Sequence, residues 1–305
     1  MKKPNFFIVG APKCGTTSLY FYLKQHPDIF MPEDKKEPHF FCTDFAAGHW
    51  HIRDLQTYLN LFASAHNEKM LGEASTFYLY SQNASREIKK FCPNAKIIIM
   101  LRNPVDMLYS YHNYMCWRGQ ENIFDFEQAL AAESARKQGK QQPNSVIQNL
   151  AIECLYYREL VKYSQQVQRY QDLFGKENVL IIIFDEFIKQ TANIYREVLI
   201  FLDVNATFVP EFKVINIGKK RSVKNKNLRK VVRNSFTVWL LKSWMNYFGQ
   251  DRLPKLLKIW DKINNKYERI PSINPELKMK LQQELAPEVK QISQLLGKDL
   301  NYWSK

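Results

Sequence analysis

Short, unbroken apolar runs are the clearest pattern along the chain. They occupy Phe6–Gly10, Lys96–Leu101 and Val179–Phe184, and Met70–Ala74, which contains Glu73, also looks like a short strand. Runs of this length without polar alternation are typical of parallel strands that are buried on both faces. Segments compatible with helices lie between them. Strands alternating with helices predict an α/β fold with a central, mainly parallel sheet and helices on both faces.

Apolar periodicity and end signals predict helices at 18–25, 50–65, 82–91, 104–114, 125–136, 152–174, 191–202 and 274–297, the last broken at Pro287. Further apolar stripes with helical spacing are Val232, Phe236, Leu240, Trp244 and Phe248, and then Leu256, Trp260, Ile263 and Tyr267. No repeat or boundary divides the chain. We therefore expect one domain over residues 1–305, with a basic loop and helical C-terminal extension at 213–305 packed on it.

Composition and charge narrow the class of protein. Hydrophobic residues make up 45% of the 305 residues and aromatic residues 14%, enough for a well-filled core. No apolar run approaches the roughly 20 residues that span a bilayer, so we expect a soluble, cytoplasmic protein. Five cysteines without a C-x-x-C spacing predict reduced thiols and no zinc site. The net charge of +14 indicates an anionic partner without choosing among a phosphorylated cofactor, an acidic substrate, nucleic acid and a membrane surface.

The segment Gly10–Ser18 carries the strongest candidate chemistry. A strand that enters a glycine-bounded loop and then a helix directs backbone N–H groups and the positive end of the helix dipole at the loop, which favours a phosphate. The loop nearly matches the Walker A pattern, but Thr16 stands where that pattern has lysine, and the lysine of this loop is Lys13. The sequence therefore predicts a P-loop-type three-layer fold whose ligand is not an ordinary magnesium nucleotide.

A second candidate follows the 96–101 strand. Arg102 comes at the end of this strand, Asn103 is a good N-cap for the next helix, and Ser110 lies two turns further on the same helix face as Asn103. Ligands of parallel α/β sheets bind beyond the carboxyl ends of the strands. We therefore expect Lys13, Ser75 and Arg102 to converge there.

These motifs resemble those of the sulfotransferases that use 3′-phosphoadenosine-5′-phosphosulfate (PAPS). Residues 10–17 look like the 5′-phosphosulfate loop, and residues 101–111 look like the 3′-phosphate motif R-[DN]-P-x(5)-S. Glu37-Pro38-His39-Phe40-Phe41 is similar to the segment that supplies the base in the carbohydrate and heparan-type branch. Residues 218–221 are similar to the basic cofactor loop, and residues 286–303 resemble the tail of bacterial members, so the resemblance runs nearly end to end.

The resemblance implies an enzyme that transfers a sulfuryl group from PAPS to an acceptor hydroxyl, without a metal, and leaves 3′-phosphoadenosine-5′-phosphate (PAP). Lys13 would stabilise the leaving phosphate and Glu37 would be the general base, with His39 as the rival base. The implied cofactor-binding residues are Ala11, Pro12, Lys13, Cys14, Gly15, Thr16, Thr17, Ser18, Arg102, Ser110, Gly218, Lys219, Lys220 and Arg221. The acceptor would be a carbohydrate, a glycolipid or another hydroxylated small molecule. Ala74 departs from the heparan-type pattern, in which a lysine follows the glutamate.

Other functions fit parts of the sequence. Residues 182–186, Ile-Ile-Phe-Asp-Glu, imitate a Walker B strand and allow a P-loop kinase or NTPase. Residues 213–233 hold nine basic residues and no acidic one, which allows a nucleic-acid-binding protein, but no reading motif is present and we expect no specific nucleic acid. Lysines and arginines beside the 232–267 stripes allow peripheral contact with a membrane surface.

Overall fold

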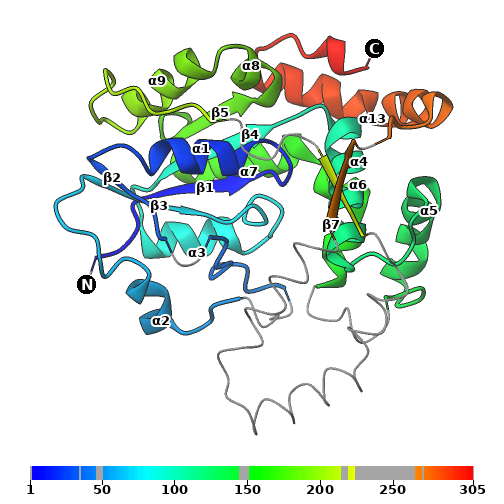
Figure 1. The fold of residues 1–305 in the computed structure, drawn as a ribbon, viewed down its shortest axis with the longest axis horizontal. Coiled ribbons are helices and arrows are strands. Elements are labelled where there is room, and N and C mark those ends of the chain that lie inside the picture. Colours follow the sequence, from blue (N-terminus) through cyan, green and yellow to red (C-terminus); the bar gives the residue numbers. More distant parts are fainter. Residues whose placement is uncertain are drawn as a thin grey trace, which may run out of the picture.

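The structure is a computed structural model, and it describes residues 2–33, 36–45, 51–143, 151–213, 219–223, 265–269 and 271–304. Its main sheet has five parallel strands in the order β2-β3-β1-β4-β5 (Figure 1). The strands are β1 (Phe6–Gly10), β2 (Ile29–Phe30), β3 (Met70–Ala74), β4 (Lys96–Leu101) and β5 (Val179–Ile183). Strand β1 therefore lies at the centre, between β3 and β4.

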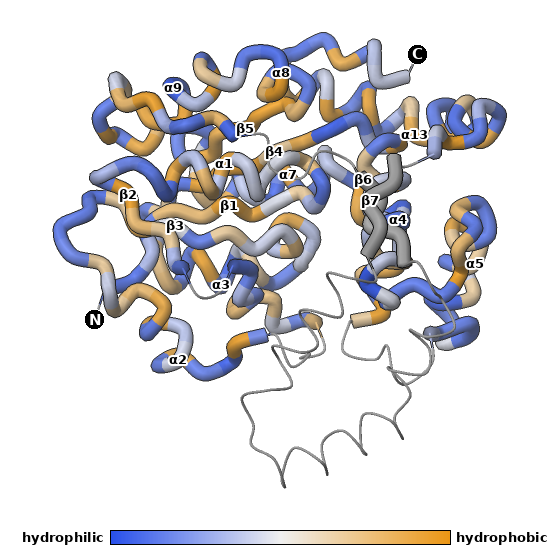
Figure 2. The backbone as a smooth tube through the Cα atoms, viewed as in Figure 1, coloured by the Kyte–Doolittle hydropathy of each residue, from blue (hydrophilic) through white to orange (hydrophobic). Residues whose placement is uncertain are grey.

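The predicted strands and the α/β class are confirmed. All residues of β1 and β3 are buried, and so are five of the six residues of β4, in agreement with the unbroken apolar runs (Figure 2). Each buried Ile or Phe side chain stabilises the fold by roughly 1.5–3 kcal/mol. Strand β2 was not predicted, because its two residues are too few to form a pattern.

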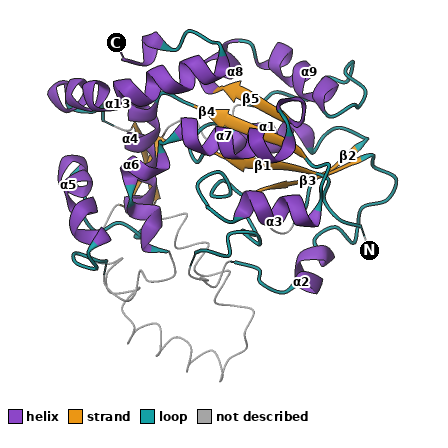
Figure 3. Ribbon diagram, turned by 180° about the vertical axis from the view of Figure 1, so that it is seen from behind, coloured by secondary structure: helices purple, strands orange, loops and turns teal. Residues whose placement is uncertain are grey.

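Helices cover both faces of the sheet (Figures 1 and 3). On one face, α1 (Thr16–Leu23) packs with α8 (Phe184–Lys189) and α9 (Thr191–Phe201), where the Tyr195 hydroxyl donates to the Tyr22 carbonyl. On the other face, α3 (Ala84–Phe91) packs with α7 (Tyr163–Phe174). The chain runs from β1 through α1 towards β2 and β3, and it returns from β3 through α3 to β4. Right-handed crossovers in opposite directions place α1 and α3 on opposite faces of the sheet.

Helix α4 (Pro104–Arg118) begins directly after Arg102 and leads away from the carboxyl edge of the sheet. As predicted, Asn103 caps it, because its Oδ1 accepts from the N–H groups of Val105 and Asp106. The Asn103 amide also donates to the carbonyl of Trp303, and the buried Trp303 indole donates to Asp185. The C-terminal turn Asn301–Ser304 is therefore tied to the beginning of α4.

Three predicted helices differ from the structure. The predicted 152–174 helix is instead a 3₁₀ turn (Ile152–Leu155), α6 (Tyr157–Leu160) and α7. The 50–65 helix shrinks to α2 (Leu55–Asn60), whose N-cap is Asp54. The C-terminal helix, α13 (Pro275–Leu296), continues through Pro287, because its apolar face packs against α7 and α4 on both sides of the proline.

Two short strands lie beside α4. β6 (Lys219–Val223) pairs antiparallel with β7 (Asn265–Arg269), and β6 runs next to α4 (Figure 1). The helical stripe predicted through Tyr267 is therefore wrong at that residue, which belongs to β7. The stripe from Val232 to Phe248 lies outside the described residues, so membrane contact there stays a prediction.

Helix α5 (Phe126–Lys137) confirms the predicted 125–136 helix. None of the described helices is long and apolar enough to cross a membrane.

Candidate active site

The loop from β1 to α1 turns sharply at its end. Gly15 adopts a left-handed backbone with φ of +89° and is the N-cap of α1. A Cβ at Gly15 would meet the ring of Phe184 at 2.9 Å, so both the backbone and the space require glycine. The N–H groups of Thr16 and Thr17 lie in the first turn of α1, where a helix offers them no acceptor. The loop can therefore hold an anion, as predicted from the sequence.

Lys13 lies in the loop between β1 and α1. Its Nζ is 4.6 Å from the ring centroid of Tyr114 on α4. Burial lowers the pKa of Lys13, Glu37 opposes this change, and Arg102 and Lys36 add to it. Printed contacts link the three segments at this edge of the sheet. The Phe184 ring lies beside both Gly15 and Arg102, and Lys36 Nζ lies 2.6 Å from Thr17 Oγ1 and 3.4 Å from Glu37 Oε1.

Arg102 presents an unused donor. Its guanidinium lies 4.9 Å from the ring centroid of Phe184, and one Nη is 4.0 Å from Asp106 Oδ2. Its Nε is buried and has no hydrogen-bond partner among the described residues. Such an atom needs an acceptor, and a phosphate oxygen fits a guanidinium. Ser110 lies half-buried on α4, two helical turns beyond this arginine.

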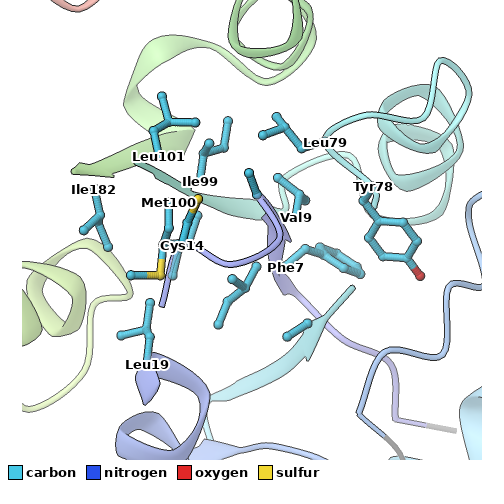
Figure 4. Close-up of a cluster of buried hydrophobic side chains, with 14 of the residues drawn as sticks. Phe7, Val9, Cys14, Leu19, Tyr78, Leu79, Ile99, Met100, Leu101 and Ile182 are labelled. Carbon is cyan, nitrogen blue, oxygen red and sulfur yellow. The ribbon is translucent and has the colours of Figure 1, made fainter. Parts of the chain in front are cut away.

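Part of the predicted basic loop, residues 218–221, lies close to α4, the helix that follows Arg102. Lys219, Lys220 and Arg221 lie in β6, whose backbone runs beside α4. Gly218 lies outside the described residues. Of the other implied cofactor residues, Ala11 and Cys14 are buried. The Cys14 thiol lies among Leu19, Met100 and Ile182 (Figure 4), and burial raises its pKa to about 12. Cys14 can therefore offer a ligand its backbone but no thiolate.

The segment that carries Glu37 and His39 has a strained backbone. Both residues are left-handed, with φ of +63° and +49°. Such conformations of non-glycine residues cost of order 1–3 kcal/mol each and persist where the surroundings fix them. The Glu37 N–H donates to the Ala74 carbonyl at the end of β3, and the His39 N–H donates to Ser75 Oγ. Glu37 is 35% exposed, and its Oε2 lies 3.9 Å from His39 Nε2.

Arg53 holds the same segment from the other side. One of its Nη atoms donates to the carbonyls of His39 and Phe40, and the other donates to those of Cys42 and Phe45. The planar fork of a guanidinium spreads five donors over three nitrogen atoms, so one side chain can reach carbonyls that are too far apart for a single ammonium nitrogen. The sequence did not single out Arg53, because its acceptors are backbone atoms in a different loop.

Glu73 is a second residue that was not assigned a role from the sequence. Its carboxylate is 1% exposed and accepts from the hydroxyls of Tyr58 at 2.8 Å, Tyr78 at 2.9 Å and Ser75 at 2.5 Å. Burial raises the pKa of Glu73 to about 7, the three hydroxyl donors oppose the rise, and Glu37 adds to it. The sequence signal that could have revealed the role of Glu73 was the presence of an acidic residue inside a strand predicted to be buried. Through Ser75, this carboxylate supports the N–H of His39.

The Walker B alternative fails on geometry. Strand β5 ends at Ile183, and Asp185 lies in the first turn of α8. Its carboxylate accepts from the Trp303 indole at 3.0 Å, and Glu186 pairs with Lys298 at 2.7 Å. These carboxylates therefore have structural partners. Among the described residues, no group of three or more His, Cys, Asp or Glu is placed to hold a metal.

A phosphate loop after the central strand, with an arginine at the end of the neighbouring strand, defines an α/β protein of the P-loop type that binds a phosphorylated ligand. The chain belongs to the sulfotransferase family, because the family model described as "Sulfotransferase domain" matches residues 3–266. Sulfotransferases transfer a sulfuryl group from PAPS to a hydroxyl or amine, so the chain carries a domain of the PAPS-dependent sulfotransferase type.

Individual relatives agree with the family. The crystal structure of a sulfotransferase from Alicyclobacillus acidocaldarius is 31% identical, has a TM-score of 0.72, and matches over 100% of both chains. The membrane-associated sulfotransferase kil1 of Dictyostelium discoideum is 37% identical over 37% of this chain and 24% of its own length. Human carbohydrate sulfotransferase 15 is 33% identical over 36% of this chain and 27% of its own. The chain thus spans about a quarter of these curated relatives.

Proposed function

We propose that this enzyme transfers the sulfuryl group of PAPS to a hydroxyl of a glycan or another hydroxylated acceptor. The proximity of the phosphate loop to Arg102 and to Glu37 carries the proposal: Phe184 lies beside Gly15 and Arg102, and Lys36 contacts both Thr17 and Glu37. Two cations, Lys13 and Arg102, suit a donor with two phosphorylated ends, and a nearby carboxylate suits proton transfer from an alcohol.

Each residue has a role that follows from its place. The first turn of α1 and the Lys13 ammonium would bind the 5′ end of the donor, and Lys13 would stabilise charge on the leaving phosphate oxygen. Arg102, with its free Nε, and Ser110 would bind the 3′-phosphate. Lys219 to Arg221, in β6 beside α4, would add positive charge there. Because the chemistry is mainly charge redistribution, these residues act by position and electrostatics.

Glu37 is the proposed base, and His39 remains the rival. Glu37 is 35% exposed, so an acceptor can reach its carboxylate. The His39 side chain is 7% exposed and lies against the rings of His51 and Phe77. A base must come within hydrogen-bond reach of the proton that it removes. This exposure favours Glu37.

The acceptor class rests on relatives. Carbohydrate sulfotransferase 15 and the heparan sulfate N-deacetylase/N-sulfotransferases carry glycan substrates in their names, and mouse N-deacetylase/N-sulfotransferase 4 is 28% identical over 66% of this chain. The match covers 22% of that relative. We therefore propose a glycan or glycolipid hydroxyl first and a small hydroxylated molecule second.

The test is incubation with ³⁵S-labelled PAPS and a panel of glycans, glycolipids and small alcohols, with amines included. We expect label on at least one hydroxyl acceptor, and loss of transfer in Lys13→Ala and Glu37→Gln. Replacement of His39 by Asn separates the two bases, because it should leave most of the transfer. Transfer by Glu37→Gln at the parent rate would overturn the assignment of the base, and label on amines alone would overturn the acceptor class.

A further inference from the structure

Lys36, the residue before the proposed base, reaches across to the phosphate loop. Its Nζ lies 2.6 Å from Thr17 Oγ1 in the first turn of α1 and 3.4 Å from Glu37 Oε1. Its side chain is only 22% exposed. Within the described part of the chain, Glu37 is the carboxylate within 4.0 Å of this ammonium. A mostly buried lysine needs compensating charge or hydrogen bonds. The contacts with Thr17 and Glu37 supply both, so they hold the Lys36 ammonium in this position.

The Thr17 hydroxyl and the Lys36 ammonium each keep a hydrogen-bond donor that a ligand can use. A threonine hydroxyl has two acceptor lone pairs and one hydrogen to donate. Thr17 accepts from Lys36 and can still donate. An ammonium has three N–H groups, and the contacts of Lys36 with Thr17 and Glu37 use two of them. An anionic oxygen that accepts from the Thr17 hydroxyl therefore also comes within reach of the Lys36 ammonium.

We propose that Lys36 is a further binding and catalytic residue, which contacts the 5′-phosphosulfate of PAPS together with Thr17. The inference rests on the proposed function. In the reaction, the acceptor oxygen forms a bond to sulfur and its proton passes to Glu37. The bond from sulfur to the phosphate oxygen breaks, and its electron pair stays on that oxygen, giving PAP. When Glu37 becomes neutral, Lys36 loses its carboxylate partner just as negative charge grows on the phosphate oxygen, and the ammonium compensates that charge.

Binding of two nucleotides tests this without knowledge of the acceptor. PAP has the 5′-phosphate, and adenosine 3′-phosphate lacks it. Calorimetric titration of the parent, Lys36→Met and Lys36→Arg with both nucleotides isolates the interaction between residue 36 and the 5′-phosphate. Lys24→Met is the matched control, because Lys24 directly follows α1, pairs with Glu33 at 2.8 Å, and plays no part in the proposed site.

We expect Lys36→Met to weaken PAP binding about tenfold, as for the loss of one charge-assisted hydrogen bond, and to change binding of adenosine 3′-phosphate less than about twofold. Lys36→Arg should recover most of the PAP affinity, and Lys24→Met should match the parent. Thermal unfolding of each variant reports on folding. An equal loss for both nucleotides, or no loss for PAP, would overturn the role of Lys36. A parent that fails to bind PAP would overturn the proposed function itself, and this inference with it.

Discussion

Replacement of the buried Glu73 by glutamine should change how the stability of the protein depends on pH. Glu73 lies in β3, 1% exposed, with three hydroxyl donors around it. Burial raises its pKa from 4.5 to about 7. The folded protein therefore holds this proton over a pH range in which the unfolded chain has released it. The stability that the bound proton provides is complete below pH 4.5 and is lost as the pH rises to about 7.

The size of the effect follows from the shift. Each unit of pKa corresponds to about 1.4 kcal/mol, so ionisation of Glu73 costs the folded protein about 3 kcal/mol by pH 8. Glutamine has the same shape and does not ionise. The free energy of unfolding of Glu73→Gln minus that of the parent should therefore be about 3 kcal/mol larger at pH 8 than at pH 4.5, which means that the variant gains stability relative to the parent.

Urea unfolding followed by circular dichroism at several pH values between 4.5 and 8 measures this difference. Tyr78→Phe is the comparison, because it removes a donor to the ionised carboxylate. This variant should lose about 1–2 kcal/mol more at pH 8 than at pH 4.5. Parallel pH profiles for the parent and Glu73→Gln would refute the reasoning, since they would show that Glu73 has the same pKa in the folded and unfolded states.

Three further predictions concern the site. Lys13→Ala should lower kcat about 100-fold or more in the labelled-PAPS assay, as for the loss of a transition-state donor, and a loss below threefold would contradict its role. Arg102→Lys keeps the charge but removes the paired N–H donors of the guanidinium, so PAP affinity should fall about tenfold while affinity for adenosine 5′-phosphate stays within about twofold. Equal losses for the two nucleotides would rule out recognition of the 3′-phosphate by Arg102. Arg53→Lys should speed amide hydrogen exchange in residues 37–45 about tenfold and leave residues 6–23 unchanged; unchanged exchange in 37–45 would show that the guanidinium does not hold that segment.

Local patterns predicted the strands and the phosphate loop well. The apolar run of β4 and the Asn103 cap are properties of adjacent residues, and a parallel sheet brings the ends of its strands together whatever its detailed packing. For this reason the sequence alone predicts that Lys13 and Arg102 lie at the same edge of the sheet. Their contacts with PAPS stay a prediction, as do the basic loop at 218–221 and the cytoplasmic location.

Other features depend on contacts between distant residues and had no sequence pattern. The three donors to Glu73 come from positions 58, 75 and 78, and none of them is marked by periodicity. The four carbonyls bound by Arg53 are backbone atoms, which every sequence has. The 152–174 segment forms a 3₁₀ turn, α6 and α7 although its apolar spacing fits one helix. Tertiary packing overrode helical propensity there.

Trp303 has a consequence for how the enzyme is handled. Its carbonyl accepts a hydrogen bond from the side-chain amide of Asn103, the neighbour of Arg102, and its indole N–H donates to the Asp185 carboxylate. Deleting the last few residues, or attaching an affinity tag that displaces this turn, should therefore loosen the Arg102 guanidinium and weaken PAP binding, although these residues are not among those proposed to hold the nucleotide.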